Sequence, residues 1–304
     1  MESLIGIFGG VRGESAALVA ALCWAIASVG WGRAGRAVPP LELNFIKGSV
    51  AVVLLTITLA LRGDLLVGVE WRAVWLLALS GAVGIGLGDT AYFEAINALG
   101  ARRALLLTML APPLAGIVAW VSLGERLAPT AWIGMALTIA GVAWVITERI
   151  PGSGKPAAHL VRGVWMGVLA ALTQVLGAVL TRAAFSQTSV TPLFSALLRM
   201  SAAVVVVFLW IVLSRPSRKW TIHRSRDMWG LVLAATFVGT YMGISLQQFA
   251  FKFANTGVAQ TLLSTSPLFI LPITMALGEK VSPRAVAGVV VALAGIAMLF
   301  GIVG

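Results

Sequence analysis

The sequence predicts an all-α polytopic membrane protein, with about ten transmembrane helices arranged as two inverted five-helix repeats around a central cavity. Three observations support this prediction: a very apolar composition, a series of long apolar segments, and a motif that occurs twice. Of the 304 residues, 59% are hydrophobic and 11% are charged, whereas about a quarter of residues are charged in soluble domains. A soluble protein of this composition would lack the polar surface to cover itself, so we expect a lipid environment.

Ten segments are long and apolar enough to cross a bilayer, because a crossing helix needs about 20 mostly apolar residues. Their expected bounds are 14–36, 39–61, 72–95, 101–122, 128–147, 162–185, 192–213, 228–251, 257–277 and 282–303. The two longest connections, 148–161 and 214–227, are too short to hold a soluble domain. We therefore expect a multi-pass integral protein of the plasma or inner membrane.

The net charge of +11 does not indicate a nucleic-acid partner. The basic residues stand singly or in short groups at the ends of apolar runs, whereas nucleic-acid binding needs them gathered on one face. Basic flanks are typical of membrane anchoring and orientation, so the expected macromolecular environment is membrane lipid.

A repeated turn motif divides the chain into two halves. Residues 124–129 read Gly-Glu-Arg-Leu-Ala-Pro, and residues 278–283 read Gly-Glu-Lys-Val-Ser-Pro. Other positions match in the same order: Pro40 and Pro192, Lys47 and Arg199, Gly84-x-x-x-Gly88 and Gly239-x-x-x-Gly243, and Pro113 and Pro267. We expect one five-helix repeat in residues 1–150 and a second in 151–304. An odd number of helices inverts the second repeat, an architecture typical of secondary transporters that bind substrate between the halves.

In these features the chain resembles the drug/metabolite transporter superfamily, in its EamA-type branch of two five-helix repeats. The doubled Gly-Glu turn, the mid-span prolines before it, and a basic residue early in the second helix of each half (Lys47, Arg199) match that family over nearly the whole chain. The resemblance implies a carrier of small molecules such as amino acids or related metabolites, and it implies no catalytic residue. It also implies cytoplasmic termini, whereas the distribution of basic residues places the termini outside.

Charged side chains within a bilayer are costly and therefore mark candidate sites. Lys47 lies about eight residues into the second helix and Asp89 about six residues before the end of the third, which runs antiparallel. We expect these two side chains at similar depth, paired directly or through water or substrate; a static ion pair between the helices is an equally favoured interpretation. Glu94 points to another face of the third helix, so we expect it at a helix contact or the water boundary.

Arg199 is the repeat partner of Lys47, and the second half offers it no acidic residue. Gln247 and Gln248 stand near the corresponding end of the eighth helix. A buried guanidinium needs acceptors, and the carboxylate of an amino or organic acid would suit it. Backbone carbonyls and water are the alternative partners.

Further polar or aromatic residues are candidates for substrate contact. Trp24 in the first helix matches Gln174 in the sixth, so the two should face each other across the pseudo-axis if the repeat holds. Packing in the core or against lipid is the slightly favoured alternative for Trp24. Asn44 lies a turn before Lys47, and Gln260 lies early in the ninth helix.

Pro112, Pro113 and Pro267 are candidate hinges, because they fall near mid-membrane in the fourth and ninth helices. Proline removes a backbone donor and frees a carbonyl one turn earlier, and transporters bend or line cavities at such places. A static kink that only improves packing is the alternative.

The sequence therefore favours a secondary transporter, an exporter of small polar or amphipathic metabolites such as amino acids, that works by alternating access. One alternative is a proton-coupled exporter of multiple drugs or cationic compounds, for which Asp89 would be essential. An alternative of another class is a non-transporting scaffold or a membrane enzyme. We expect no enzyme activity and no cofactor, because the sequence contains no phosphate-binding loop and no metal-ligand cluster. A monomer and a homodimer are both compatible with the sequence.

Overall fold

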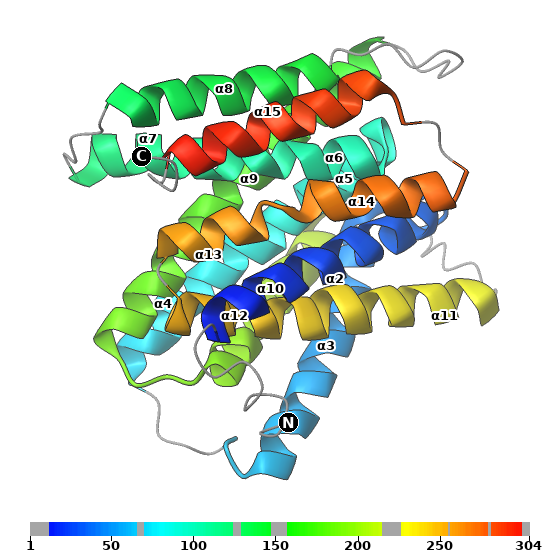
Figure 1. Ribbon diagram of the computed structural model, residues 1–304. Coiled ribbons are helices and arrows are strands. Elements are labelled where there is room, and N and C mark those ends of the chain that lie inside the picture. Colours follow the sequence, from blue (N-terminus) through cyan, green and yellow to red (C-terminus); the bar gives the residue numbers. More distant parts are fainter. Residues whose placement is uncertain are drawn as a thin grey trace.

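The computed structural model describes residues 12–65, 70–123, 129–146, 157–214, 226–254, 256–278 and 281–299. Within these ranges every regular element is a helix (Figure 1). The Glu125 and Glu279 turns that define the sequence repeat, and the greater part of both long connections, lie outside the described residues.

Within the described residues of the first half there are nine helical elements. They are α2 (Arg12–Ala34), α3 (Pro40–Arg62), α4 (Trp71–Gly81), η1 (Ala82–Leu87), α5 (Gly88–Leu99), α6 (Ala101–Leu107), η2 (Thr108–Leu110), α7 (Ala111–Leu123) and α8 (Pro129–Ile146). Here η1 is a π-helical segment and η2 a short 3-10 helix.

The second half follows the same order. Its elements are α9 (Ala157–Gln187), α10 (Pro192–Ser214), α11 (Arg226–Ala235), η3 (Thr236–Met242), α12 (Gly243–Phe253), α13 (Thr256–Leu263), α14 (Ser266–Ala276) and α15 (Pro283–Leu299). The segment η3 is again π-helical. Each of the ten expected segments thus falls on one helix or on a run of consecutive helices.

In the part of the chain that the structure describes, six stretches are long and apolar enough to cross a membrane by length and composition. They are Gly13–Ala34, Pro40–Arg62, Trp71–Leu99, Ala158–Gln187, Pro192–Ser214 and Asp227–Phe253. Three further helices in the described ranges are also apolar but are shorter: Trp132–Val145, Ser266–Ala276 and Pro283–Met298. The chain is therefore a multi-pass membrane protein, whereas the number of ten crossings stays a prediction.

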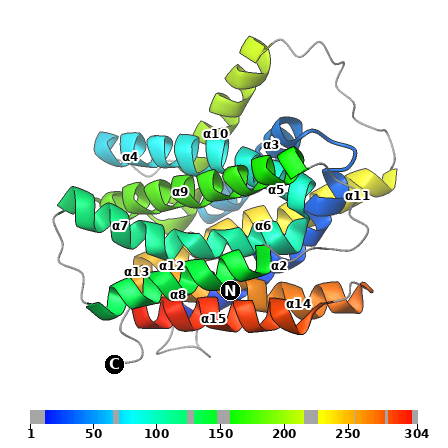
Figure 2. The ribbon, with the colours of Figure 1, turned by 90° about the horizontal axis from the view of Figure 1, so that it is seen from above.

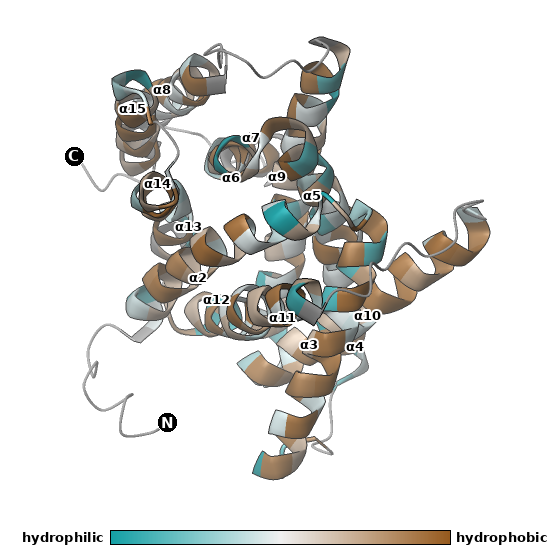
Figure 3. Ribbon diagram, turned by 90° about the vertical axis from the view of Figure 1, so that its right-hand side faces the viewer, coloured by the Kyte–Doolittle hydropathy of each residue, from teal (hydrophilic) through white to brown (hydrophobic). Residues whose placement is uncertain are grey.

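Apolar side chains cover much of the outer surface, as expected for helices that face lipid. On α3, Val53 and Ile57 are at least half exposed, and on α10 Val205 and Leu213 are exposed to a similar or greater degree. Figure 3 shows hydrophobic residues along most of the length of these two helices. Such a surface would be unstable in water and is favourable in hydrocarbon.

The contacts between the two halves occur in equivalent pairs. Where a helix of the first half packs on elements of the second, its counterpart packs on the equivalent elements of the first. Helix α2 packs on α12 and η3 of the second half, and α9 packs on α5 and η1 of the first. Helix α3 packs on its counterpart α10, and α8 lies along its counterpart α15 (Figures 1 and 2). The last pair is in close backbone contact, because a Cβ atom on Gly141 would lie 2.6 Å from the Gly288 carbonyl oxygen. Small residues allow such close packing in membranes.

The two π-helical segments stand at equivalent places, where the sequence has its Gly-x-x-x-Gly spacings. A π-turn shifts the backbone register and leaves a carbonyl without its usual partner. In η1, Asn44 donates to the carbonyl groups of Ile85 at 3.0 Å and Gly86 at 3.1 Å. In η3, Trp24 Nε1 donates to the Gly239 carbonyl oxygen at 3.1 Å. In both π-helical segments, therefore, a side chain of a neighbouring helix donates hydrogen bonds to backbone carbonyl groups.

The three candidate hinge prolines lie at helix interruptions. Pro112 and Pro113 are in the first turn of α7, directly after the 3-10 helix η2. Pro267 is in the first turn of α14, after a turn at residues 264–265 that ends α13. Proline fits the first helical turn because the missing N–H has no partner there, so these residues mark where a new helical segment begins.

Candidate functional site

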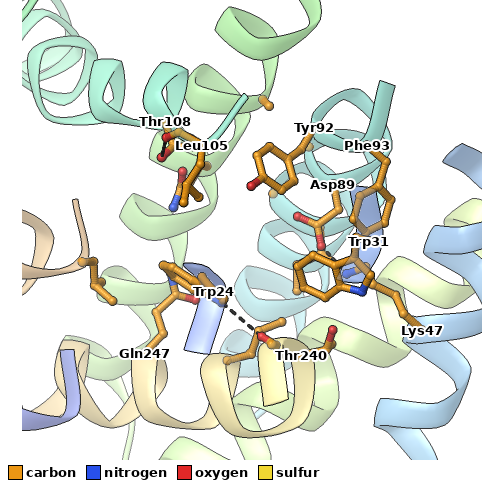
Figure 4. A pocket seen from close by; sticks show the side chains of 18 of the residues that line it. Trp24, Trp31, Lys47, Asp89, Tyr92, Phe93, Leu105, Thr108, Thr240 and Gln247 are labelled. Atoms are coloured by element: carbon orange, nitrogen blue, oxygen red, sulfur yellow. Dashed lines mark hydrogen bonds and ion pairs between the residues drawn. The ribbon is translucent and has the colours of Figure 1, made fainter. Parts of the chain in front are cut away.

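A cavity of about 100 Å³ lies between the two halves (Figure 4). Residues of α2, α3, α5, α6, α9, α10, α12 and α13, of the 3-10 helix η2 and of both π-helical segments line it. Figure 4 shows Asp89, Tyr92 and Phe93 extending from α5, with Trp24 and Gln247 on the other side of the same space. Four aromatic side chains line the cavity: Trp24, Trp31, Tyr92 and Phe93. The cavity therefore combines an apolar, aromatic lining with a few charged and polar groups, as small-molecule sites do.

The predicted contact between Lys47 and Asp89 is present as an ion pair, in which Nζ donates to Oδ2. The Lys47 side chain is only 1% exposed, whereas that of Asp89 is 30% exposed. The ammonium group also lies over two aromatic rings, 5.8 Å from the Trp31 centroid and 5.5 Å from the Phe93 centroid. Lys47 is thus fully enclosed, and Asp89 is the member of the pair that is accessible from the cavity.

Arg199 lines the same cavity from α10 and is 5% exposed. Its Nε and Nη1 atoms form no hydrogen bond with any described residue. The residue equivalent to Asp89 in the second half is Ile244, since each directly follows the glycine that begins the helix after the π-helical segment. The second half thus has no carboxylate at the position equivalent to Asp89, and the lack of an acidic partner for Arg199 stays a prediction.

Four other predicted site residues also line the cavity: Trp24, Gln174, Gln247 and Gln260. Trp24 and Gln174 come from α2 and α9, the first helix of each half, as the repeat predicts. The Trp24 indole is fixed by its hydrogen bond to the Gly239 carbonyl oxygen. Both residues are thus available to contact a molecule in the cavity.

Asn44 and Gln248 do not line the cavity. Asn44 is 2% exposed, and besides the two η1 carbonyl groups it donates to Thr90 Oγ1 at 2.8 Å. Gln248 is completely buried, and its Oε1 accepts a hydrogen bond from Ser195 Oγ at 3.1 Å. These contacts join helices within each half, because α3 packs on α5 and α10 packs on α12.

Glu94 forms an ion pair with Arg162, whose side chain is 66% exposed. The pair links α5 to α9 and lies away from the cavity lining. This agrees with the expectation of a helix contact or boundary position for Glu94.

Several lining residues were missed by the sequence reasoning. They are Trp31, Tyr92, Phe93, Thr108, Thr240 and Ser264. A helical-spacing argument could have found the first two, because Trp31 lies two turns after Trp24 and Tyr92 one turn after Asp89. Thr240 lies in a π-helical segment, where ordinary helical spacing does not predict the direction of a side chain.

Comparisons with known proteins agree with this architecture. The model of the EamA-like transporter family matches the chain twice, over residues 11–147 and 161–301. The "Uncharacterized transporter YoaV" of Bacillus subtilis (strain 168) is 27% identical over 132 residues, which are 43% of this chain and 45% of that protein. The chain thus aligns with under half the length of that curated relative. A solved structure, "Crystal structure of protein", superposes with a TM-score of 0.69 at 19% identity and covers 94% of this chain and 95% of the other. At that identity the likeness concerns the fold.

Proposed function

The chain belongs to the EamA-like transporter family, and from this premise we propose that it is a secondary carrier that exports small polar or amphipathic metabolites, such as amino acids or related compounds. The observation that supports this most directly is the cavity between the halves, where charged and aromatic side chains from both repeats meet. Charged groups buried in a membrane protein are costly and are retained where they serve a transport path.

The proposed mechanism is alternating access by two inverted five-helix repeats, residues 1–150 and 151–304, with ten crossings in total. The equivalent pairs of contacts between the halves support this mechanism. Because the contacts are equivalent, a rotation of one repeat against the other would open the cavity to each side in turn. The interruptions at Pro112, Pro113 and Pro267 are proposed hinges. The π-helical segments η1 and η3 are further places where a helix can change register at the cavity wall.

Counterflow in proteoliposomes tests the function. Vesicles that contain the full chain are loaded with one unlabelled solute from a set of amino acids, organic acids and organic cations, and uptake of the labelled solute is followed. We expect saturable uptake of at least one solute, and a strong reduction in the Asp89→Asn variant because Asp89 is the accessible carboxylate in the cavity. The exposed Asp64→Asn serves as the matched control. Uptake equal to that of protein-free vesicles for the whole set would contradict the proposal.

A second candidate is a proton-coupled exporter of cationic compounds. It is favoured by the exposed part of the Asp89 carboxylate and by the aromatic rings around it, which attract cations. Uptake of a labelled organic cation should then be driven by an imposed pH gradient and abolished by Asp89→Asn. Uptake that is indifferent to the gradient would exclude this candidate in favour of the first.

A non-transporting scaffold or a membrane enzyme remains the alternative of another class. Within the described ranges no group of three or more His, Cys, Asp and Glu side chains could hold a metal ion. A scaffold would show no flux of any solute, whereas an enzyme would convert a labelled solute, which chromatography of the vesicle contents would reveal.

A further inference from the structure

We propose that the Arg199 side of the cavity is a subsite for a carboxylate group, and that the transported solute is a small organic anion with a single negative charge. This inference rests on the proposed carrier function and narrows its substrate class to monoanionic carboxylates, among the related metabolites rather than the zwitterionic amino acids. Three features support it: the buried donors of Arg199, the glycines that fix the position of its guanidinium, and the charge balance of the cavity lining.

The guanidinium of Arg199 has unmet hydrogen-bonding capacity. Its Nε and Nη1 atoms are buried and have no acceptor among the described residues. An arginine cannot lose its proton in a protein, and a buried donor without an acceptor is costly, especially on a charged group. A carboxylate can satisfy these donors, because each of them forms a fork with Nη2 whose two parallel N–H bonds match the two carboxylate oxygen atoms.

Three glycines give the side chain of Arg199 its position. A Cβ atom on Gly81 would overlap the backbone of Arg199, so only glycine allows α10 to approach α4 this closely. Gly84 and Gly177 flank the guanidinium, since a Cβ atom on either would lie 3.5 or 3.6 Å from Nη2. The guanidinium is therefore held between η1 and α9 at the cavity wall.

The charge balance indicates a monoanion. Among the described lining residues, the charged groups are Lys47, Asp89 and Arg199. The carboxylate of this set, Asp89, already bonds to Lys47. One positive charge thus remains in a low-dielectric space. A monoanion would neutralise it, a zwitterion would leave it, and a cation would add to it.

The other residues that line the cavity indicate the chemistry of the rest of the solute. Trp24, Trp31 and Tyr92 offer aromatic surface, and Trp31 Nε1 and Thr240 Oγ1 are further groups without a hydrogen bond to described residues. An apolar or aromatic body with a carboxylate at one end fits this arrangement. Lactate, benzoate and phenylacetate are suitable probes, and their neutral amides are nearly isosteric controls.

Thermal stabilisation of the purified full chain in detergent tests the subsite directly. We expect at least one of the three carboxylates to raise the unfolding temperature, whereas its amide does not. The Arg199→Gln variant should bind that carboxylate about 10- to 100-fold more weakly, the effect of losing charge-assisted hydrogen bonds. Arg62→Gln removes the same charge at an exposed site and should bind like the parent.

A second variant keeps Arg199 and tests the subsite by adding a carboxylate within the protein that competes with the probe. Ile244 is 7% exposed and packs in one cluster with Met200 of α10. Ile244→Asp supplies the second half with the acid that Asp89 supplies to the first, so the new carboxylate should occupy Arg199 and prevent stabilisation by the probe. This variant gives an answer even if Arg199→Gln fails to fold.

The outcomes separate this inference from the carrier function. Equal binding of a carboxylate and its amide, undiminished binding by Arg199→Gln, or no stabilisation by any of the three carboxylates would overturn the subsite. If proteoliposomes transport a neutral or cationic solute and Arg199→Gln transports it at the parent rate, the subsite is wrong while the carrier function stands. If a carboxylate binds through Arg199 but nothing crosses the membrane, the carrier function fails and the subsite stands.

Discussion

Lys47 and Arg199 occupy equivalent positions in the two halves, yet their surroundings differ. Lys47 is 1% exposed, bonds to Asp89 and lies over two aromatic rings. Arg199 is 5% exposed, and two of its nitrogen atoms have no partner in the described part of the chain. The difference comes from one position, since the second half has Ile244 where the first has Asp89. In a duplicated fold, two equivalent basic residues can thus differ in how far the protein itself satisfies their hydrogen-bonding groups.

The largest effect that tests this comparison is expected from Lys47→Met. Removal of the lysine leaves the Asp89 carboxylate beside Trp31 and Phe93 without its partner. We expect the free energy of unfolding to fall by about 3 kcal/mol, at the low end of the range for a broken buried ion pair because Asp89 is partly exposed. Tryptophan fluorescence during unfolding in detergent measures it.

The double variant Lys47→Met with Asp89→Asn is the control, because it removes both charges together. It should recover part of the lost stability. A Lys47→Met protein as stable as the parent would show that the pair does not stabilise the structure and would weaken the contrast with Arg199.

The next effect concerns the glycines of the two π-helical segments. A Cβ atom on Gly239 would overlap Ala27 and lie 2.6 Å from Trp31 Cη2, whereas one on Gly84 would come no closer than 3.3 Å, to Gly177 Cα. We expect Gly239→Ala to destabilise the protein by about 1–3 kcal/mol through overpacking, and Gly84→Ala by less. The same unfolding assay compares them, and equal losses would show that the two segments are packed alike.

Arg199→Met is expected to change the free energy of unfolding by a smaller amount, and the direction of that change is what tests the comparison. Methionine keeps much of the apolar stem and removes a buried charged group whose Nε and Nη1 atoms have no hydrogen-bond acceptor among the described residues. We expect the free energy of unfolding to stay within about 1 kcal/mol of the parent or to rise, because an unpaired buried charge is itself unfavourable. A loss as large as that of Lys47→Met would mean that Arg199 is satisfied within the protein, and the comparison would fail.

Much of the fold could be predicted from the sequence, because length and hydropathy decide where a helix can cross a membrane. The Lys47 and Asp89 contact was predictable for the same reason, since depth in two antiparallel helices follows from residue counts. The division of long segments into α4, η1 and α5, or into α13 and α14, was not predicted. A π-turn depends on packing and on carbonyl partners such as Asn44, which sequence spacing alone does not reveal.

The site was predicted less completely than the fold. Lys47, Asp89 and Arg199 were found because charge in a membrane is rare, whereas Tyr92 and Phe93 were missed because aromatic residues are common in membrane helices. Asn44 and Gln248 were included for their polarity, but each makes hydrogen bonds within its own half. Polarity in a span can therefore indicate burial with a hydrogen-bonding partner instead of a place in a cavity.

The smallest expected effect is that of Glu94→Gln, and it compares the two acidic residues of α5. Asp89 pairs with a lysine that is almost completely enclosed, whereas Glu94 pairs with Arg162, which is 66% exposed. Exposed ion pairs contribute about 0–1 kcal/mol and are screened by salt. Glu94→Gln should therefore change the free energy of unfolding by less than about 1 kcal/mol, and the change should shrink as salt is raised. Asp89→Asn measured in the same series should keep its effect in high salt, because its lysine partner is shielded from the solvent by protein. If the two variants responded to salt in the same way, the enclosure of Lys47 would not distinguish the pair inside the cavity from the pair at the surface.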